Sequence, residues 1–112
     1  MAMQYHETRI YRVALAIAAG VKRLSGALPS GHSYLGDQMQ RAASSVVLNF
    51  AEGCGKRTRA DRARFFAMAR GSANEVRAAV DVAAALELVT LDAVLDLRDR
   101  CAHVGSMLGK FA

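Results

Sequence analysis

The chain has 112 residues, of which 53% are hydrophobic, 22% are charged and 6% are aromatic, and its formal net charge is +5. This composition predicts one globular domain over residues 1–112. It excludes a disordered chain, which would be poorer in hydrophobic residues, and a disulfide-rich secreted domain, which would need more than Cys54 and Cys101. Because so short a chain covers only about two thirds of the surface that it exposes when unfolded, its high hydrophobic content also favours self-association into a homo-oligomer.

Hydrophobic residues recur every three or four positions in residues 10–28 and again in residues 35–50. This spacing predicts a first helix over about residues 7–27 and a second helix after it, joined by the turn-forming segment 28–36. Residues 13–21 form an uncharged run that is too short to cross a bilayer. The charged residues that flank the run also argue against an export signal, so we expect a core helix of a cytoplasmic protein with reduced thiols.

Two glycines near the end of the second helix predict a turn over residues 53–57. Thr58 followed by Asp61 is typical of a helix N-terminus, and the third helix is expected to continue to about residue 88. Its hydrophobic side is expected to comprise Phe65, Met68, Ala69, Ser72, Val76, Ala79, Val80, Ala83 and Leu86. Thr90 is expected to begin a fourth helix. With no strand-like alternation in the chain, these elements predict an all-α, up-and-down four-helix bundle.

The excess positive charge lies in one short segment. Residues 56–70 contain six basic residues and a single acidic residue, Asp61. On one side of the third helix, the spacing of 3.6 residues per turn predicts a basic stripe of Arg59, Arg62, Arg70 and Arg77. Phe66 falls among these arginines, away from the expected hydrophobic side, and an aromatic residue in that position needs an explanation.

Three interpretations fit the stripe. In the first, basic side chains contact the phosphates of RNA or DNA while Phe66 stacks on a base. The residues expected to contact phosphates are Lys56, Arg57, Arg59, Arg62, Arg70 and Arg77. In the second, Phe66 fills a pocket on a neighbouring subunit. In the third, arginine stems shield Phe66 and the charges are simply solvated. A ring of identical subunits would repeat the basic segment around its axis and so strengthen the positive surface.

Four polar residues lie where the second and third helices are expected to meet: Asn49, Glu52, Ser72 and Glu75. We expect a hydrogen-bond network there, since buried polar groups are normally paired. A catalytic pair of Glu52 and Glu75 is the alternative, but no nucleophile, metal-binding cluster or phosphate-binding loop accompanies it. The chain is therefore interpreted as non-enzymatic, without a cofactor or a metal. Gly71 is expected to let another backbone approach closely, because glycine weakens a helix interior.

Two segments resemble the signatures of a known family. The sequences N-F-A-E-G at residues 49–53 and A-R-G-S-A-N-E at residues 69–75 resemble the motifs N-[IF]-A-E-G and A-x-G-S-x-x-E of the four helix bundle protein family. That family is also known as the proteins encoded by intervening sequences in bacterial large-subunit ribosomal RNA genes. The resemblance covers nearly the whole chain. By position, it implies structural roles for Asn49, Glu52, Gly53, Gly71, Ser72 and Glu75.

The resemblance implies a small four-helix protomer that assembles as a ring-like homopentamer with a basic surface. The family includes the accessory variability determinant of diversity-generating retroelements, which is understood to bind a reverse transcriptase and nucleic acid without catalysis of its own. We therefore expect a non-enzymatic, oligomeric nucleic-acid-binding or adaptor protein. Its basic surface would centre on the loop between the second and third helices and on the start of the third. The alternative is a protein-only scaffold that docks onto an acidic protein partner.

Overall fold

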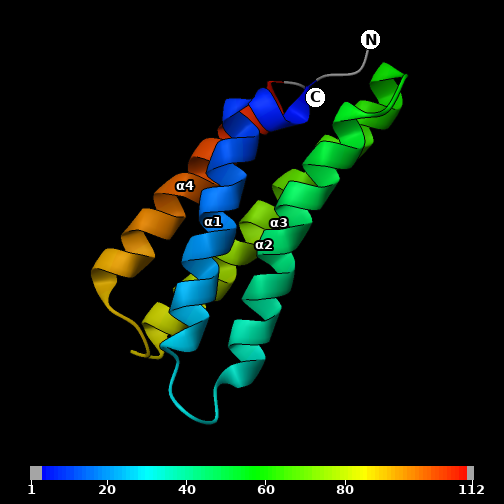
Figure 1. Cartoon of the computed structure of the whole chain (residues 1–112). Coiled ribbons are helices and arrows are strands. Elements are labelled where there is room, and N and C mark those ends of the chain that lie inside the picture. Colours follow the sequence, from blue (N-terminus) through cyan, green and yellow to red (C-terminus); the bar gives the residue numbers. More distant parts are fainter. Residues whose placement is uncertain (1–3, 111–112) are drawn as a thin grey trace.

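The computed structural model describes residues 4–110, which form a short 3₁₀ helix and four α-helices. After the 3₁₀ helix η1 (Tyr5–Glu7) come α1 (Arg9–Gly26), α2 (Ser33–Cys54), α3 (Arg59–Ala85) and α4 (Leu91–Gly109). Each α-helix packs against two others, in the cyclic order α1, α2, α3, α4. In Figure 1, α1 and α4 lie on one side of the molecule and α2 and α3 on the other. The expected all-α four-helix bundle is confirmed.

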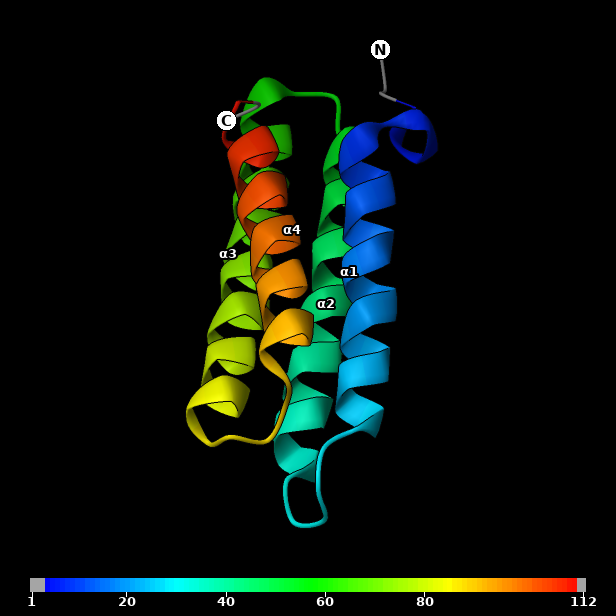
Figure 2. The same ribbon diagram turned by 90° about the vertical axis from the view of Figure 1, so that its left-hand side faces the viewer.

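Neighbouring helices run in opposite directions (Figure 2), and three side-chain contacts show which residues lie at the same height. The contacts are Ser25 Oγ to Gly36 O at 3.3 Å, Ser72 Oγ to Ser45 Oγ at 2.8 Å and Arg98 Nε to Asp81 Oδ1 at 3.2 Å. The α2–α3 loop therefore lies at one end of the bundle, while the α1–α2 and α3–α4 loops share the opposite end (Figure 2).

The core runs the length of the bundle and is hydrophobic throughout. Phe50 and Phe66 stack near its α2–α3 end, with ring centroids 5.5 Å apart and an interplanar angle of 25°. Aliphatic side chains and alanines fill the rest, and no polar or charged residue is buried in the described part of the chain. None of the helices in this range combines the length and hydropathy needed to cross a membrane.

The hydrophobic side expected for the third helix is partly wrong. The buried residues of α3 are Phe66, Ala69, Ala73, Val76, Ala79, Val80 and Ala83. Met68 and Leu86, which were expected in the core, are 46% and 48% exposed. The helix carries two adjacent hydrophobic stripes, and the contact with α2 decides between them. A Cβ at Gly53 would lie 2.7 Å from Phe66 Cε1, so only glycine leaves room for this ring.

Gly71 has no close neighbour within the protomer, contrary to expectation. If a Cβ is built at Gly71, no heavy atom of the described residues lies within 4 Å of it, apart from its two chain neighbours and the nearby backbone of its own helix. The close approach that the sequence suggested for Gly71 occurs instead at Gly53, where the side chains of α3 press on α2. Gly71 is an exposed residue inside α3. Within a single chain, no neighbouring element requires a glycine at this position.

Both ends of α3 have clear local causes. Thr58 Oγ1 accepts a hydrogen bond from the Asp61 N–H at 3.1 Å, which confirms the predicted N-cap. The helix ends at Ala85, earlier than expected, because Glu87 adopts φ +60°. The N–H groups of Glu87 and Leu88 then bond back to the last turn at 3.0 and 2.9 Å, as in a Schellman cap.

Candidate nucleic-acid interface

The α2–α3 loop and the first turns of α3 place a dense group of cations at one end of the bundle. Arg57, Arg59 and Arg64 are exposed, and Lys56 and Arg62 are half-buried. We call these five residues the basic loop cluster. Because α1 begins and α4 ends at the same end, exposed Arg9 and Lys110 add to its charge. Their contribution was not foreseen, since both residues are far from the cluster in the sequence.

Arg62 holds the loop in place. Its Nη1 donates to the carbonyl oxygens of Lys56 at 3.1 Å and of Arg57 at 2.9 Å. The guanidinium therefore braces the two residues that precede the helix cap, in addition to any contact with a ligand. Sequence spacing alone identified Arg62 as a surface cation and gave no sign of this bracing.

Phe65, and not Phe66, is the aromatic residue among the cations. Lys56 Nζ lies 5.0 Å and Arg64 Cζ 4.7 Å from the centroid of the Phe65 ring, at distances typical of cation–π contacts. Lys56 Nζ also pairs with Glu52 Oε1 at 3.1 Å. Arg64 was not among the predicted site residues, because its position on the helical wheel lies outside the expected stripe.

The predicted role of Phe66 is wrong. Its side chain is 2% exposed and stacks on Phe50, so it cannot reach a nucleic-acid base or a neighbouring subunit. The error follows from the choice of core side described above. Phe66 is instead one of the largest fully buried side chains in the bundle.

The rest of the predicted stripe extends away from the cluster. Arg70 and Arg77 are exposed, but they lie along α3 at increasing distance from the loop, and Arg77 is 18 residues or about 27 Å from Arg59 along the helix axis. The Arg70 guanidinium lies beside Gly109 in the last turn of α4. Partial negative charge at a helix C-terminus favours a cation in this position.

A hydrogen-bond network joins α2 and α3, as expected, but with different members. Asn49 Nδ2 donates to Ser45 Oγ at 2.8 Å and to Ser45 O at 3.0 Å, and Ser72 Oγ donates to Ser45 Oγ at 2.8 Å. Glu52 and Glu75 are both exposed. They lie about 13 Å apart along the bundle axis, because Glu52 is level with residue 66 of α3. They do not share a cleft.

The two cysteines are free and buried. Burial raises the pKa of each thiol from 9.0 to about 11, and nearby Arg77 lowers the pKa of Cys101 only in part. Both thiols are therefore protonated and unreactive at neutral pH. In the described residues, no group of three or more His, Cys, Asp or Glu side chains is placed to hold a metal ion.

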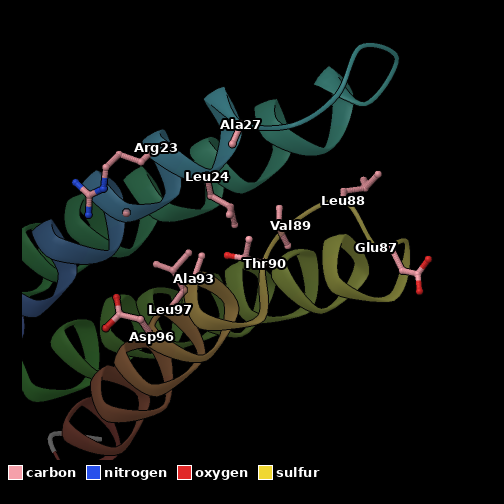
Figure 3. A pocket seen from close by; sticks show the side chains of 11 residues that line it. Arg23, Leu24, Ala27, Glu87, Leu88, Val89, Thr90, Ala93, Asp96 and Leu97 are labelled. Carbon is pink, nitrogen blue, oxygen red and sulfur yellow. The ribbon is translucent and has the colours of Figure 1, made fainter.

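A cavity of about 630 Å³ lies at the opposite end of the bundle (Figure 3). We call it the α1–α4 cavity, because the second half of α1, the α3–α4 loop and the start of α4 form its walls. Leu24, Leu97 and Ala93 contribute apolar surface, and the charged residues that line the cavity are Arg23, Glu87 and Asp96. This cavity is separate from the basic loop cluster.

The fold has a counterpart among solved structures. A crystal structure of a protein of unknown function from the S23 ribosomal protein family of Bacteroides thetaiotaomicron superposes with a TM-score of 0.83. The alignment covers 90% of this chain and 95% of the other chain at 18% sequence identity, which supports a shared fold. No curated protein matches the chain significantly.

A family model also matches almost the whole chain. The model describes the 23S rRNA-intervening sequence protein family, and the match covers residues 6–110. It includes all four α-helices and the segments whose motifs suggested this relationship. The chain therefore belongs to the 23S rRNA-intervening sequence protein family.

Proposed function

We propose that this protein is a non-enzymatic, self-associating protein that binds the phosphate backbone of nucleic acid through the basic loop cluster. The carrying observation is the unneutralised charge of three arginines in that cluster. Arg57, Arg59 and Arg64 are exposed, and no carboxylate among the described residues lies within ion-pair distance of them. Cations grouped in this way attract a polyanion, because each phosphate contact releases condensed counterions.

Contact with phosphates is favoured over reading of bases. Phe66 is buried, and the ring of Phe65 is already flanked by Lys56 and Arg64. Phosphate contacts position a protein on nucleic acid but carry no sequence information. We therefore expect strongly salt-dependent binding with little sequence preference. RNA is the first ligand to test, given the ribosomal RNA setting in the family's description.

Self-association is supported by hydrophobic side chains that remain on the surface. Nine large hydrophobic residues of the described chain are more than one third exposed. A ring of copies would place several basic loop clusters together and strengthen the attraction of each for the same polyanion. A pentamer is the form that the family resemblance implies.

Fluorescence anisotropy with a labelled RNA at several salt concentrations tests the nucleic-acid proposal. If each protomer neutralises four or five phosphates, log K should fall with log salt at a slope of about −4. Replacing both Arg57 and Arg59 by Ala should flatten the slope to about −2. The matched control is Arg98→Ala with Arg100→Ala, which removes the same charge from α4 and should leave the slope unchanged.

Two outcomes would reject the proposal. One is no saturable binding of RNA or DNA at low salt, which would favour the protein-only scaffold with an acidic partner. The other is an equal loss of binding in both double variants, because net charge alone would then explain the attraction. Arg62→Lys adds a further check, since it keeps the charge and removes the planar brace on the loop. We expect it to weaken binding while it leaves the salt slope near −4.

A further inference from the structure

An open cleft of about 300 Å³ lies between α3 and the last turn of α4. The two helices run side by side in Figure 2, and the cleft is near the end of the bundle that carries the basic loop cluster. Its exposed lining residues are Ala67, Arg70, Gly71, Asn74 and Gly109. We call it the α3–α4 cleft. The phosphate contacts proposed above for the basic loop cluster leave it unused.

Gly71 gives the cleft its open side. A glycine inside a helix weakens the helix by about 1 kcal/mol relative to alanine. Packing within the chain does not account for this loss, because a Cβ built at Gly71 would meet no other element within 4 Å. A backbone without a Cβ allows a ligand to approach closely. A ligand from outside the protomer would therefore explain the glycine.

The α4 side of the same seam also lacks large side chains. A Cβ built at Gly109 would lie 3.6 Å from Arg70 Nη1, and one built at Gly105 would lie 4.0 Å from Arg70 Cγ. Because the two helices are antiparallel, Arg77, two turns farther along α3, is level with Ala102, two turns back in α4. The seam is thus bordered by long cationic side chains on α3 and by small residues on α4.

The cations of this seam are not neutralised by carboxylates of the described residues. Arg70 and Arg77 are exposed, and neither has an ion-pair partner there. Glu75 lies between them in the sequence but about 140° around the helix from Arg70. Asp81, farther along the seam, pairs with Arg98 at 3.2 Å. The positive part of the seam therefore extends from the basic loop cluster to Arg77.

We infer that this seam continues the nucleic-acid-binding surface as a path for a single strand, with one unpaired base in the α3–α4 cleft beside Gly71. Arg70 and Arg77 contact phosphates of the strand, because the guanidinium fork matches phosphate oxygens. The amide of Asn74 both donates and accepts hydrogen bonds, so it can pair with the edge of any base. The inference rests on the proposed function and adds the form of the nucleic acid and its course over the protein.

The dimensions of the site favour a single strand over a duplex. A volume of about 300 Å³ has room for one small ligand group, such as a base. The bases of a duplex are stacked inside it, so a duplex would leave the cleft empty. Arg59 and Arg77 lie about 27 Å apart along the helix axis, which is about eight nucleotides of a stacked strand at roughly 3.4 Å each.

Fluorescence anisotropy with a labelled uridine tetramer and a labelled uridine decamer tests this path. At about 0.1 M salt, which confines charge effects to about 10 Å, the decamer should bind about tenfold more tightly, because only the decamer reaches Arg77. Arg70→Ala with Arg77→Ala should remove this gain and leave tetramer binding within about twofold. Lys22→Ala with Arg41→Ala is the matched control, since it removes the same charge from exposed positions on α1 and α2. It should keep the gain.

Filling the cleft provides a second test that leaves the charge unchanged. Gly71→Leu enters open space and favours the helix, so urea unfolding should show a protein at least as stable as the unchanged one. Its affinity for the decamer should fall by about tenfold, as expected for the loss of one base contact. Its affinity for the decamer paired with its complement should stay the same. Ala19→Leu, at an exposed position of α1, is the control and should change neither affinity.

The outcomes separate this inference from the proposed function. If the tetramer and the decamer bind equally, or if Gly71→Leu leaves decamer binding unchanged, the strand does not follow the seam, although the basic loop cluster still binds nucleic acid. A paired decamer that loses as much affinity in Gly71→Leu as the single strand would overturn the assignment to a single strand. If neither oligonucleotide binds at any salt concentration, the proposed function itself fails, and the path along the seam fails with it.

Discussion

At Gly53, one missing methyl group decides which phenylalanine of α3 enters the core. Phe65 and Phe66 lie about 100° apart on the helix, and the sequence pattern alone fits either one. Gly53 lies directly against Phe66, at a point where a side chain would overlap the ring. The contact is between residues 13 positions apart, so the periodicity of a single helix could not reveal it.

Gly53→Ala should therefore destabilise the protein. The new Cβ would lie 2.7 Å from Phe66 Cε1 and 3.1 Å from Phe65 Cβ, and overpacking of this kind costs about 1–3 kcal/mol. Urea unfolding followed by circular dichroism measures the change. Gly71→Ala is the matched control, because it meets no atom within 4 Å and should stabilise α3 by up to about 1 kcal/mol. Equal effects of both substitutions would contradict this packing.

The buried thiols should make the protein less stable at alkaline pH. Their pKa rises from 9.0 to about 11 on folding, so the folded state binds more protons than the unfolded state between these values. The associated stability is fully present below pH 9 and is lost as the pH rises through 11, at up to about 3 kcal/mol per thiol. Unfolding free energies measured from pH 8 to about pH 11 should fall less steeply in Cys54→Ala with Cys101→Ala. Parallel curves would show that the thiols do not titrate in this way.

At the scale of the element, α3 ends in a conformation that its sequence does not favour. Glu87 occupies the left-handed position of the Schellman cap, where glycine is common because it has no Cβ. Glu87→Gly should raise the free energy of unfolding by about 1 kcal/mol. Glu87→Ala changes the side chain but keeps the Cβ, so it should give little gain. The prediction fails if the two variants are equally stable in thermal or urea unfolding.

The sequence was sufficient to predict where the helices lie along the chain. It was not sufficient to predict which side of each helix faces its neighbours. The elements can be identified from the spacing of hydrophobic residues, the turn-forming segment 28–36 and the Thr58 cap, because these signals are local. The rotation of α3 is different, since it has hydrophobic residues on more than one side and its orientation depends on Gly53. The same reason explains why Phe65 and Arg64 were missed as neighbours of Lys56.

At the scale of the whole molecule, the antiparallel order of the helices brings together basic residues that are far apart in the sequence. The start of α1, the α2–α3 loop and the end of α4 meet at one end, which brings Arg9 and Lys110 to the basic loop cluster. The carboxylates of Asp81, Asp92 and Asp96 lie on the opposite half. The charge excess within residues 56–70 was predictable by counting, but the polarity of the bundle requires its antiparallel order.

The hydrogen bonds from Arg62 to the two loop carbonyls have a thermodynamic consequence for any anion that reaches this end. A loop that becomes ordered only when the ligand binds would lose conformational entropy on binding, and this loss would weaken the complex. Here the backbone of Lys56 and Arg57 is already immobilised when the chain folds. Association would then proceed without a disorder-to-order transition, and its heat capacity change would be small.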